Sequence, residues 1–224
     1  MSDELKKQAA LAALDEIRSG MVVGLGTGST ATHFIRGLGD KVRAGMKVVA
    51  IPTSEASRQQ AEEAGIPLTN FKDHPDIDLT VDGADEVSPH LDLIKGLGGA
   101  LVREKIVAHA SKRVIIVVDE SKLVRKLGIK TAIPVEVITL AAERLIRQLQ
   151  DLGGEAVVRE KNGKPFVSDN GNTILDWKHG AIEEPAALEK YLKGMTGVVD
   201  SGIFAGVANA VIVAASSGIR KLAR

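Results

Sequence analysis

Residues 21–38, MVVGLGTGSTATHFIRGL, contain the pattern that decides the fold of this chain. The first four residues are apolar and predict a short buried strand, the glycine-rich turn follows at 24–30, and the remaining residues predict a helix. This order presents backbone N–H groups and the positive end of the helix to an anion. Thr27, Ser29 and Thr30 add hydroxyl donors. The turn is therefore a candidate anion site, although a tight turn that binds nothing has the same pattern.

Two well-known nucleotide motifs do not fit this turn. A dinucleotide fingerprint needs a third glycine further on and an acidic residue that closes the second strand. Here the second strand, predicted over 47–51, is followed by Pro52-Thr53-Ser54, and Glu55 comes only after them. A P-loop needs a lysine before its Ser or Thr, and none is present.

Strands and helices alternate on both sides of the turn. Further helices are predicted over 4–17, 54–64 and 100–110, and further strands over 66–68, 77–81 and 114–118. Because parallel strands need helical crossovers, this alternation predicts an α/β fold, a Rossmann-like open parallel sheet with helices on both faces.

The pattern changes after Gly128. Strands are then predicted over 135–138, 155–159, 173–177 and 198–204, and helices over 140–152 and 185–192. This βαββαβ order is the ferredoxin-like arrangement, and the Asn-Gly pairs at 162–163 and 170–171 are typical of hairpin turns. The apolar stretch at 208–215 is expected to return to the main sheet. We therefore predict a Rossmann-like catalytic domain of residues 1–128 and 205–224, and an inserted ferredoxin-like α+β domain of residues 129–204.

Composition limits the class of protein. The chain has 224 residues, of which 44% are hydrophobic, and its 29 basic and 29 acidic side chains give no net charge. A nucleic-acid binder would show a basic excess, and the 3% of aromatic residues leaves few stacking platforms. The absence of cysteine excludes thiolate chemistry. The N-terminus lacks the apolar block of a signal peptide, and the longest apolar run, 114–118, is too short to span a bilayer. We therefore expect a soluble cytoplasmic protein that binds neither membrane nor nucleic acid.

Three carboxylates follow the strand predicted over 77–81, namely Asp82, Asp85 and Glu86. In an open parallel sheet, ligands lie beyond the carboxyl ends of the strands. Asp82 and Asp85 would there bind the hydroxyls of a polyol. A divalent-metal site and a charged turn that caps a helix are the alternatives, and the histidines are scattered without the spacing of metal ligands.

The stretch 95–105, KGLGGALVREK, combines a glycine loop with charged groups. Glycines let the backbone approach a ligand closely. Glu104 falls in the first turns of the following helix, and Lys95 precedes the loop. A carboxylate base beside a fixed cation is what proton abstraction next to a carbonyl requires, because the cation holds the enediolate oxygen as it becomes negative. A solvated helix face is the alternative for residues 103–105.

Lys122 follows the strand predicted over 114–118 and is a candidate contact to a phosphate or sugar oxygen, although a loop lysine can also do nothing. Together, these stretches are predicted to meet at one sheet edge as a pocket for a phosphorylated polyol. No nucleophile elbow of the form Gly-x-Ser-x-Gly is present.

Taken together, the motifs resemble the type A ribose-5-phosphate isomerase family. They are Gly26–Thr30, Asp82–Glu86, Lys95–Ala100 with Arg103–Lys105, Pro134–Val137, and Asp169–Asn172 with Leu175-Asp176. The resemblance runs over nearly the whole length. It implies interconversion of ribose 5-phosphate and ribulose 5-phosphate in the non-oxidative pentose phosphate pathway, through an enediolate, with neither metal nor other cofactor. It also implies a homo-oligomer, a dimer or tetramer.

The resemblance also implies roles for individual residues. Glu104 matches the base that moves a proton between C2 and C1, and Asp82, Asp85 and Lys95 match catalytic residues around the sugar. Lys6 or Lys7 is expected to help bind phosphate. Leu97 departs from the glycine of many members, but only its backbone N–H is needed. The implied substrate-binding residues are Thr27, Gly28, Ser29, Thr30, Asp82, Gly83, Ala84, Asp85, Lys95, Gly96, Leu97, Gly98 and Lys122.

Two other functions are weighed against the isomerase. A non-catalytic sugar-phosphate sensor would need a DNA-binding module, and the chain has no N-terminal helix-turn-helix or basic patch. A nucleotide-dependent oxidoreductase would need the acidic residue that is missing after the second strand.

Overall fold

The structure is a computed structural model that describes residues 3–224, and the chain divides into two compact units. The first unit comprises Met1–Ala84, Arg103–Lys122 and Val207–Arg224, and the second comprises Asp85–Val102 and Leu123–Gly206. Among residues 3–224, none of the helices has the length and apolar character that a membrane crossing requires.

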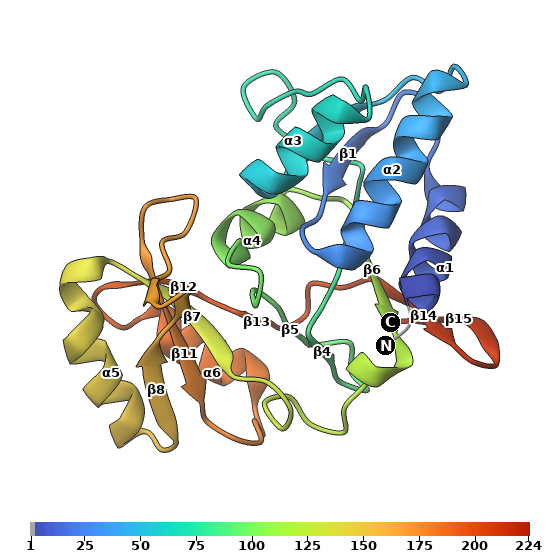
Figure 1. The fold of residues 1–224 in the computed structure, drawn as a ribbon. Helices are drawn as coiled ribbons and strands as arrows, with labels where there is room; N and C mark the ends of the chain where they lie inside the picture. The colour runs from blue at the N-terminus through green and yellow to red at the C-terminus, as the bar shows by residue number, and fades with distance from the viewer. Residues whose placement is uncertain (1–2) are drawn as a thin grey trace. The chain divides into compact units, whose positions relative to one another are not determined.

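A six-stranded sheet forms the centre of the first unit (Figure 1). Its strands, in spatial order, are β15 (Gly218–Ala223), β14 (Ala210–Ala215), β6 (Val114–Asp119), β3 (Leu79–Asp82), β1 (Val22–Leu25) and β2 (Val49–Pro52). Neighbouring strands are parallel except β14 and β15, which are antiparallel. The apolar tail therefore returns to the main sheet, as predicted.

The predicted third strand at 66–68 is reduced to a single parallel bridge between Leu68 and Ala50. Pro67 lacks a backbone N–H, so this edge segment cannot continue a regular ladder. Counting the bridge as an edge position, the parallel strands follow the Rossmann order, 3-2-1-4-5-6. The fold prediction is confirmed in this respect.

Helices cover both faces of this sheet. They are α1 (Asp3–Ala13), α2 (Ser29–Arg43), α3 (Glu55–Glu63) and α4 (Leu101–His109). Because strand side chains alternate, Val23 joins one core with Phe34 of α2, whereas Val22 joins a second core with Val107 of α4. The first core also contains residues of α1 and α3, so these helices share the face that α2 covers.

The second unit contains the predicted ferredoxin-like arrangement. Its elements are β7 (Ile133–Val137), α5 (Ala142–Asp151), β8 (Glu155–Val158), β11 (Thr173–Lys178), α6 (Pro185–Lys193) and β12 (Val198–Ser201). The antiparallel sheet has the order β12-β7-β11-β8. Its core is centred on the fully buried Trp177, with Leu145 and Leu149 of α5 and Leu192 of α6.

Both Asn-Gly pairs form turns. A short hairpin of β9 (Glu160–Lys161) and β10 (Lys164–Pro165) reverses at Asn162-Gly163, where both residues have positive φ. The second pair lies inside the turn that is closed by a bridge between Val167 and Thr173. The hairpin prediction therefore fits both pairs.

The predicted strand over 198–204 is wrong in one respect, because it is split at Gly202. Residues up to Ser201 belong to β12, whereas β13 (Ile203–Phe204) joins a small sheet with β5 (Leu93–Ile94) and β4 (Glu86–Val87). A Cβ at position 202 would lie 2.2 Å from the carbonyl oxygen of Lys95. Only glycine allows the chain to pass so close to the glycine loop.

This small sheet also explains why the compact units differ from the predicted domains. Residues 85–102 and 123–128 were expected with the main sheet, but they belong to the second unit. The strands β4 and β5 pair with β13, and Val124 and Leu127 are buried in the core of the second unit. These pairings join segments far apart in the chain, which local patterns do not reveal.

Candidate functional site

The glycine-rich turn lies in the first unit between β1 and α2. Gly28 precedes the first residue of α2 and has a φ of 103°, a conformation that favours glycine. A Cβ at Gly26 would lie 2.2 Å from Asp82 Oδ1, so the backbone here passes directly over that carboxylate. The turn thus has the strand-to-helix geometry of an anion site.

Asp82 holds this turn from the end of the neighbouring strand β3. Its Oδ1 accepts hydrogen bonds from the backbone N–H groups of Thr27, at 3.0 Å, and of Gly83, at 2.7 Å. The residue is only 2% exposed. Asp82 is therefore joined to the glycine-rich turn at residues 24–30, which is called the anion turn below. This agrees with the prediction that both lie at the same edge of the sheet.

A lysine from the N-terminal helix reaches the same turn. Lys6 Nζ donates a hydrogen bond to Ser29 Oγ over 2.8 Å. Lys7, the next residue on α1, is exposed. Of the two lysines that the sequence left open, Lys6 is the one at the start of α2, where its charge adds to the positive helix end.

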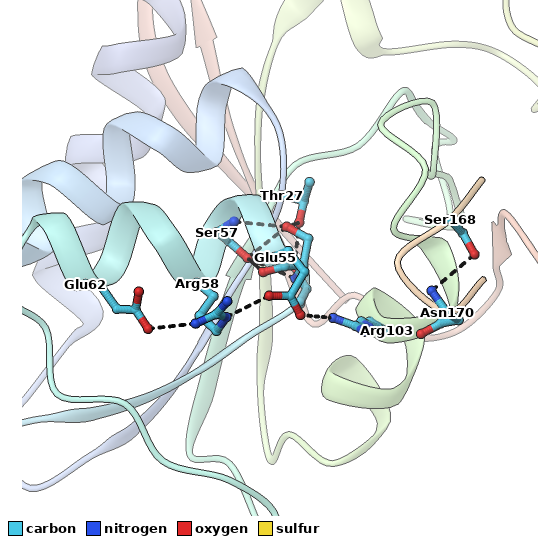
Figure 2. A network of polar contacts seen from close by, with 10 residues as sticks. Thr27, Glu55, Ser57, Arg58, Glu62, Arg103, Ser168 and Asn170 are labelled. Atoms are coloured by element: carbon cyan, nitrogen blue, oxygen red, sulfur yellow. Dashed lines mark hydrogen bonds and ion pairs between the residues drawn. The ribbon is translucent and has the colours of Figure 1, made fainter. Parts of the chain in front are cut away.

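The turn also makes hydrogen bonds through side-chain hydroxyls to the segment that follows β2 (Figure 2). Thr27 Oγ1 lies 2.8 Å from Thr53 Oγ1 and donates to Ser54 Oγ over 2.7 Å. Ser54 is the N-cap of α3 and forms a capping box with Ser57. Sequence reasoning missed Thr53 and Ser54, because the usual capping-box signal has Glu or Gln at the position of Ser57.

Glu104 lies in the first turn of α4 and is 4% exposed. Its neighbour Lys105 is 6% exposed, so the alternative of a solvated helix face for residues 103–105 is wrong for these two side chains. A buried carboxylate is costly unless it is paired or used. The predicted base is therefore a buried side chain.

A chain of ion pairs joins Arg103 of α4 to α3 (Figure 2). Arg103 Nη1 donates to Glu55 Oε1 over 2.8 Å, and Glu55 Oε2 accepts from Arg58 Nε over 2.7 Å. Arg58 in turn pairs with Glu62 at 2.9 Å. The hydrogen bonds from Arg103 and then Arg58 hold the pKa of the Glu55 carboxyl below its usual value.

Lys122 is the last of the predicted site residues that lie in the first unit. It is half-buried at the end of a short 3-10 helix, Glu120–Lys122, directly after β6. Since β1, β3 and β6 are parallel, the anion turn, Asp82 and this segment all follow carboxyl ends of adjacent strands. The predicted shared edge is confirmed for these residues.

The glycine loop and Asp85 lie in the second unit. Lys95 is 3% exposed, its N–H donates to the carbonyl of Gly202 over 2.9 Å, and its ammonium lies 5.5 Å from the centre of the Phe204 ring. The N–H of Leu97 donates to Asp85 Oδ2 over 3.0 Å. The Leu97 side chain is exposed, consistent with a position where only the backbone matters.

The carboxylates at 82–86 are engaged by backbone donors. Glu86 is fully buried and accepts hydrogen bonds from the N–H groups of Gly128, Lys130 and Thr131. Within residues 3–224, no group of three or more His, Asp or Glu side chains is placed to hold a metal ion. Asp82, Asp85 and Glu86 each accept at least one backbone N–H group.

The fold and these groups define a class: a doubly wound α/β protein with a glycine-rich strand-to-helix turn and buried acidic and basic side chains. Comparison with known proteins identifies the family. The model of the ribose 5-phosphate isomerase A (phosphoriboisomerase A) family matches residues 49–218. The chain belongs to this family.

Two individual relatives match this chain over nearly its full length. The chain is 48% identical to ribose-5-phosphate isomerase A of Roseiflexus castenholzii, covering 99% of this chain and 97% of that protein. It is 50% identical to the protein of that name from Gloeobacter violaceus, over 98% and 96%.

Solved structures give the same result. A D-ribose-5-phosphate isomerase in complex with phospho-erythronic acid superimposes with a TM-score of 0.97, at 42% identity and with both chains fully covered. Ribose 5-phosphate isomerase A from Methanocaldococcus jannaschii does so with a TM-score of 0.96, at 42% identity and full coverage of both chains.

Proposed function

We propose that this protein interconverts D-ribose 5-phosphate and D-ribulose 5-phosphate by a metal-independent enediolate proton transfer, in the non-oxidative pentose phosphate pathway. Membership of the ribose 5-phosphate isomerase A family supports the reaction. The observation that carries the mechanism is the buried carboxylate of Glu104 in the first turn of α4. Exclusion of water strengthens the electrostatic interactions of such a base with a substrate.

The phosphate is assigned to the anion turn. The hydroxyls of Thr27, Ser29 and Thr30 and the N–H groups at the start of α2 are suited to its oxygens. Lys6, which already donates to Ser29, adds a positive charge there. Lys122 is a further candidate, because it follows a neighbouring strand at the same edge.

The sugar end is assigned to the remaining predicted residues. Asp82, Asp85 and Lys95 assist ring opening and stabilise developing charge, with Gly83 and Ala84 beside them and Gly96, Leu97 and Gly98 offering backbone groups. Glu104 takes the proton from C2 of the open-chain aldose. The electron pair of that C–H bond forms the C1–C2 double bond of the enediolate, and the former carbonyl oxygen O1 becomes negative.

The second half of the reaction reverses this transfer. Glu104 returns the proton to C1, the proton of the O2 hydroxyl passes to O1, and O2 becomes the ketone oxygen while O1 becomes a hydroxyl. Lys95 stabilises the negative oxygen while the double bond exists. No atoms are gained or lost, so the reaction needs no co-reactant.

The test measures ribulose 5-phosphate formation with EDTA present. We expect turnover by the unaltered enzyme and a loss of at least about 10²-fold in kcat for Glu104→Gln, the usual contribution of a general base. Glu62→Gln, which changes an exposed carboxylate, serves as the matched control. Activity of Glu104→Gln within tenfold of the unaltered enzyme would contradict the assigned role, and ribose 5-phosphate binding without turnover would favour a sensor.

Two broader assignments accompany this proposal. A homodimer or a tetramer is the proposed assembly, which sedimentation velocity would test. The cytoplasm is the proposed location, in keeping with a metabolic enzyme that has no cysteine.

A further inference from the structure

A buried arginine holds the glycine loop of the second unit. Arg159, which follows β8 and is 9% exposed, donates from Nη1 to the carbonyl oxygens of both Gly96, at 2.8 Å, and Leu97, at 3.0 Å. These contacts join positions 62 and 63 residues apart in the chain. The loop is therefore held through its carbonyl groups.

Asp176 of β11 holds this arginine in turn. Arg159 Nε donates to Asp176 Oδ2 over 2.9 Å, and its Nη2 donates to Asp176 Oδ1, which makes the pair bidentate. Burying such a pair costs desolvation free energy, and an apolar pair of similar size is often as stable. The free energy of unfolding alone therefore does not explain why Arg159 and Asp176 form an ion pair here.

The ring of Phe166 packs against both the arginine and the loop. It lies 6.0 Å from the Arg159 guanidinium carbon, and a Cβ added at Gly99 would lie 2.4 Å from its Cζ. The turn that follows Phe166 is fixed by the buried Glu136, whose Oε1 accepts from Ser168 and from Asn170 and Asn172. Figure 2 includes Ser168 and Asn170 of this turn.

Peptide geometry gives these contacts a direction. In a planar trans peptide the C=O and the next N–H point in opposite directions. The bond from Arg159 to the Gly96 carbonyl thus turns the Leu97 N–H toward its acceptor Asp85. The bond to the Leu97 carbonyl turns the N–H of the exposed Gly98 away from the arginine.

We propose that Arg159 is a positioning residue that fixes the Leu97–Gly98 peptide, so that the Gly98 N–H donates to the substrate oxygen that becomes negative in the enediolate. This inference rests on the proposed function. Donors fixed in advance stabilise such an oxygen without reorganising during the reaction. A loop that rotates freely would lose this advantage.

The experiment replaces the ion pair by an apolar pair, Arg159→Met with Asp176→Leu, because such replacements usually keep a fold stable. We expect kcat to fall by about 10²-fold, the cost of losing or misplacing one oxyanion donor, with KM for ribose 5-phosphate changed less than threefold. Affinity for phospho-erythronic acid, whose planar carboxylate resembles the enediolate, should fall by a factor close to that in kcat/KM. If the role of Arg159 were purely structural, the double variant would have a lower melting temperature, but kcat would not fall selectively while KM stays nearly unchanged.

The matched control is the pair Arg113 and Glu16 of the first unit, joined at 2.8 Å, substituted in the same way as Arg113→Met with Glu16→Leu. Its kcat should stay within threefold of the unaltered enzyme. Arg159→Lys, which keeps the charge but lacks the planar fork, should lie between the unaltered enzyme and the double variant.

The inference is overturned if the folded double variant keeps kcat within threefold of the unaltered enzyme, or if KM alone changes. If the double variant does not fold, the same criteria apply to Arg159→Lys. An inactive unaltered enzyme would instead contradict the proposed function, so the two failures are distinguishable.

Discussion

The anion turn of the first unit and the glycine loop of the second are held in opposite ways. In the anion turn, the carboxylate of Asp82 accepts the N–H of Thr27. In the glycine loop, Arg159 donates to the carbonyls of Gly96 and Leu97. In the glycine loop the N–H groups therefore point away from Arg159, and that of Leu97 donates to Asp85, whereas the anion turn has further donors at the start of a helix.

The largest expected difference between the two regions concerns their glycines. At Gly26 a Cβ would lie 2.5 Å from the backbone Cα of Asp82, which cannot move aside. We expect Gly26→Ala to lower the free energy of unfolding by about 3 kcal/mol, the upper range for overpacking. Chemical denaturation, followed by circular dichroism, measures this quantity.

Gly99→Ala should cost less, because the added Cβ meets the ring of Phe166, a side chain that can rotate. The φ of 86° at Gly99 still disfavours alanine, so about 1–3 kcal/mol is expected. Adding Phe166→Leu should recover part of this cost. Equal losses for Gly26→Ala and Gly99→Ala would contradict the comparison.

A smaller effect is expected from the lysine at the anion turn. Lys6→Met should raise KM for ribose 5-phosphate by about tenfold or more, because a hydrogen bond to a charged group contributes about 1.5–3 kcal/mol. Lys7→Met is the matched control one position along the same helix. Steady-state kinetics with both variants separates them, and similar KM values would remove Lys6 from the phosphate site.

The smallest effect is expected at the exposed ion pair of Arg103 and Glu55. Such pairs contribute little, so Arg103→Gln should change kcat by less than threefold. Because Arg103 holds the pKa of Glu55 below its usual value, the contribution of the pair is present above the pKa of the unfolded chain and is lost as pH falls through the folded value.

Melting temperatures of Arg103→Gln and the unaltered enzyme should therefore converge as pH falls below about 4, near the usual pKa of a glutamate. The exposed Lys126→Gln, which breaks the pair with Glu183, provides a control for loss of a surface lysine. A large kcat loss for Arg103→Gln would show that this pair resembles the buried Arg159 pair after all.

Much of the fold followed from local patterns. The strand, turn and helix at 21–38 and the βαββαβ order after Gly128 were predicted correctly, because apolar periodicity and turn residues act over a few positions. The strand β15 was missed, since its residues are mostly exposed and show no apolar pattern. The small sheet of β4, β5 and β13 was missed because its strands have two residues each.

By itself, the sequence predicted which residues would carry chemistry: the anion turn, Asp82, Asp85, Lys95 and Glu104. Only the tertiary structure decided how these groups are held. The choice of Lys6 over Lys7, the burial of Glu104 and the hold of Arg159 on the glycine loop all depend on long-range contacts. Such contacts form only when segments far apart in the chain pack together. The pattern of neighbouring residues therefore does not predict them.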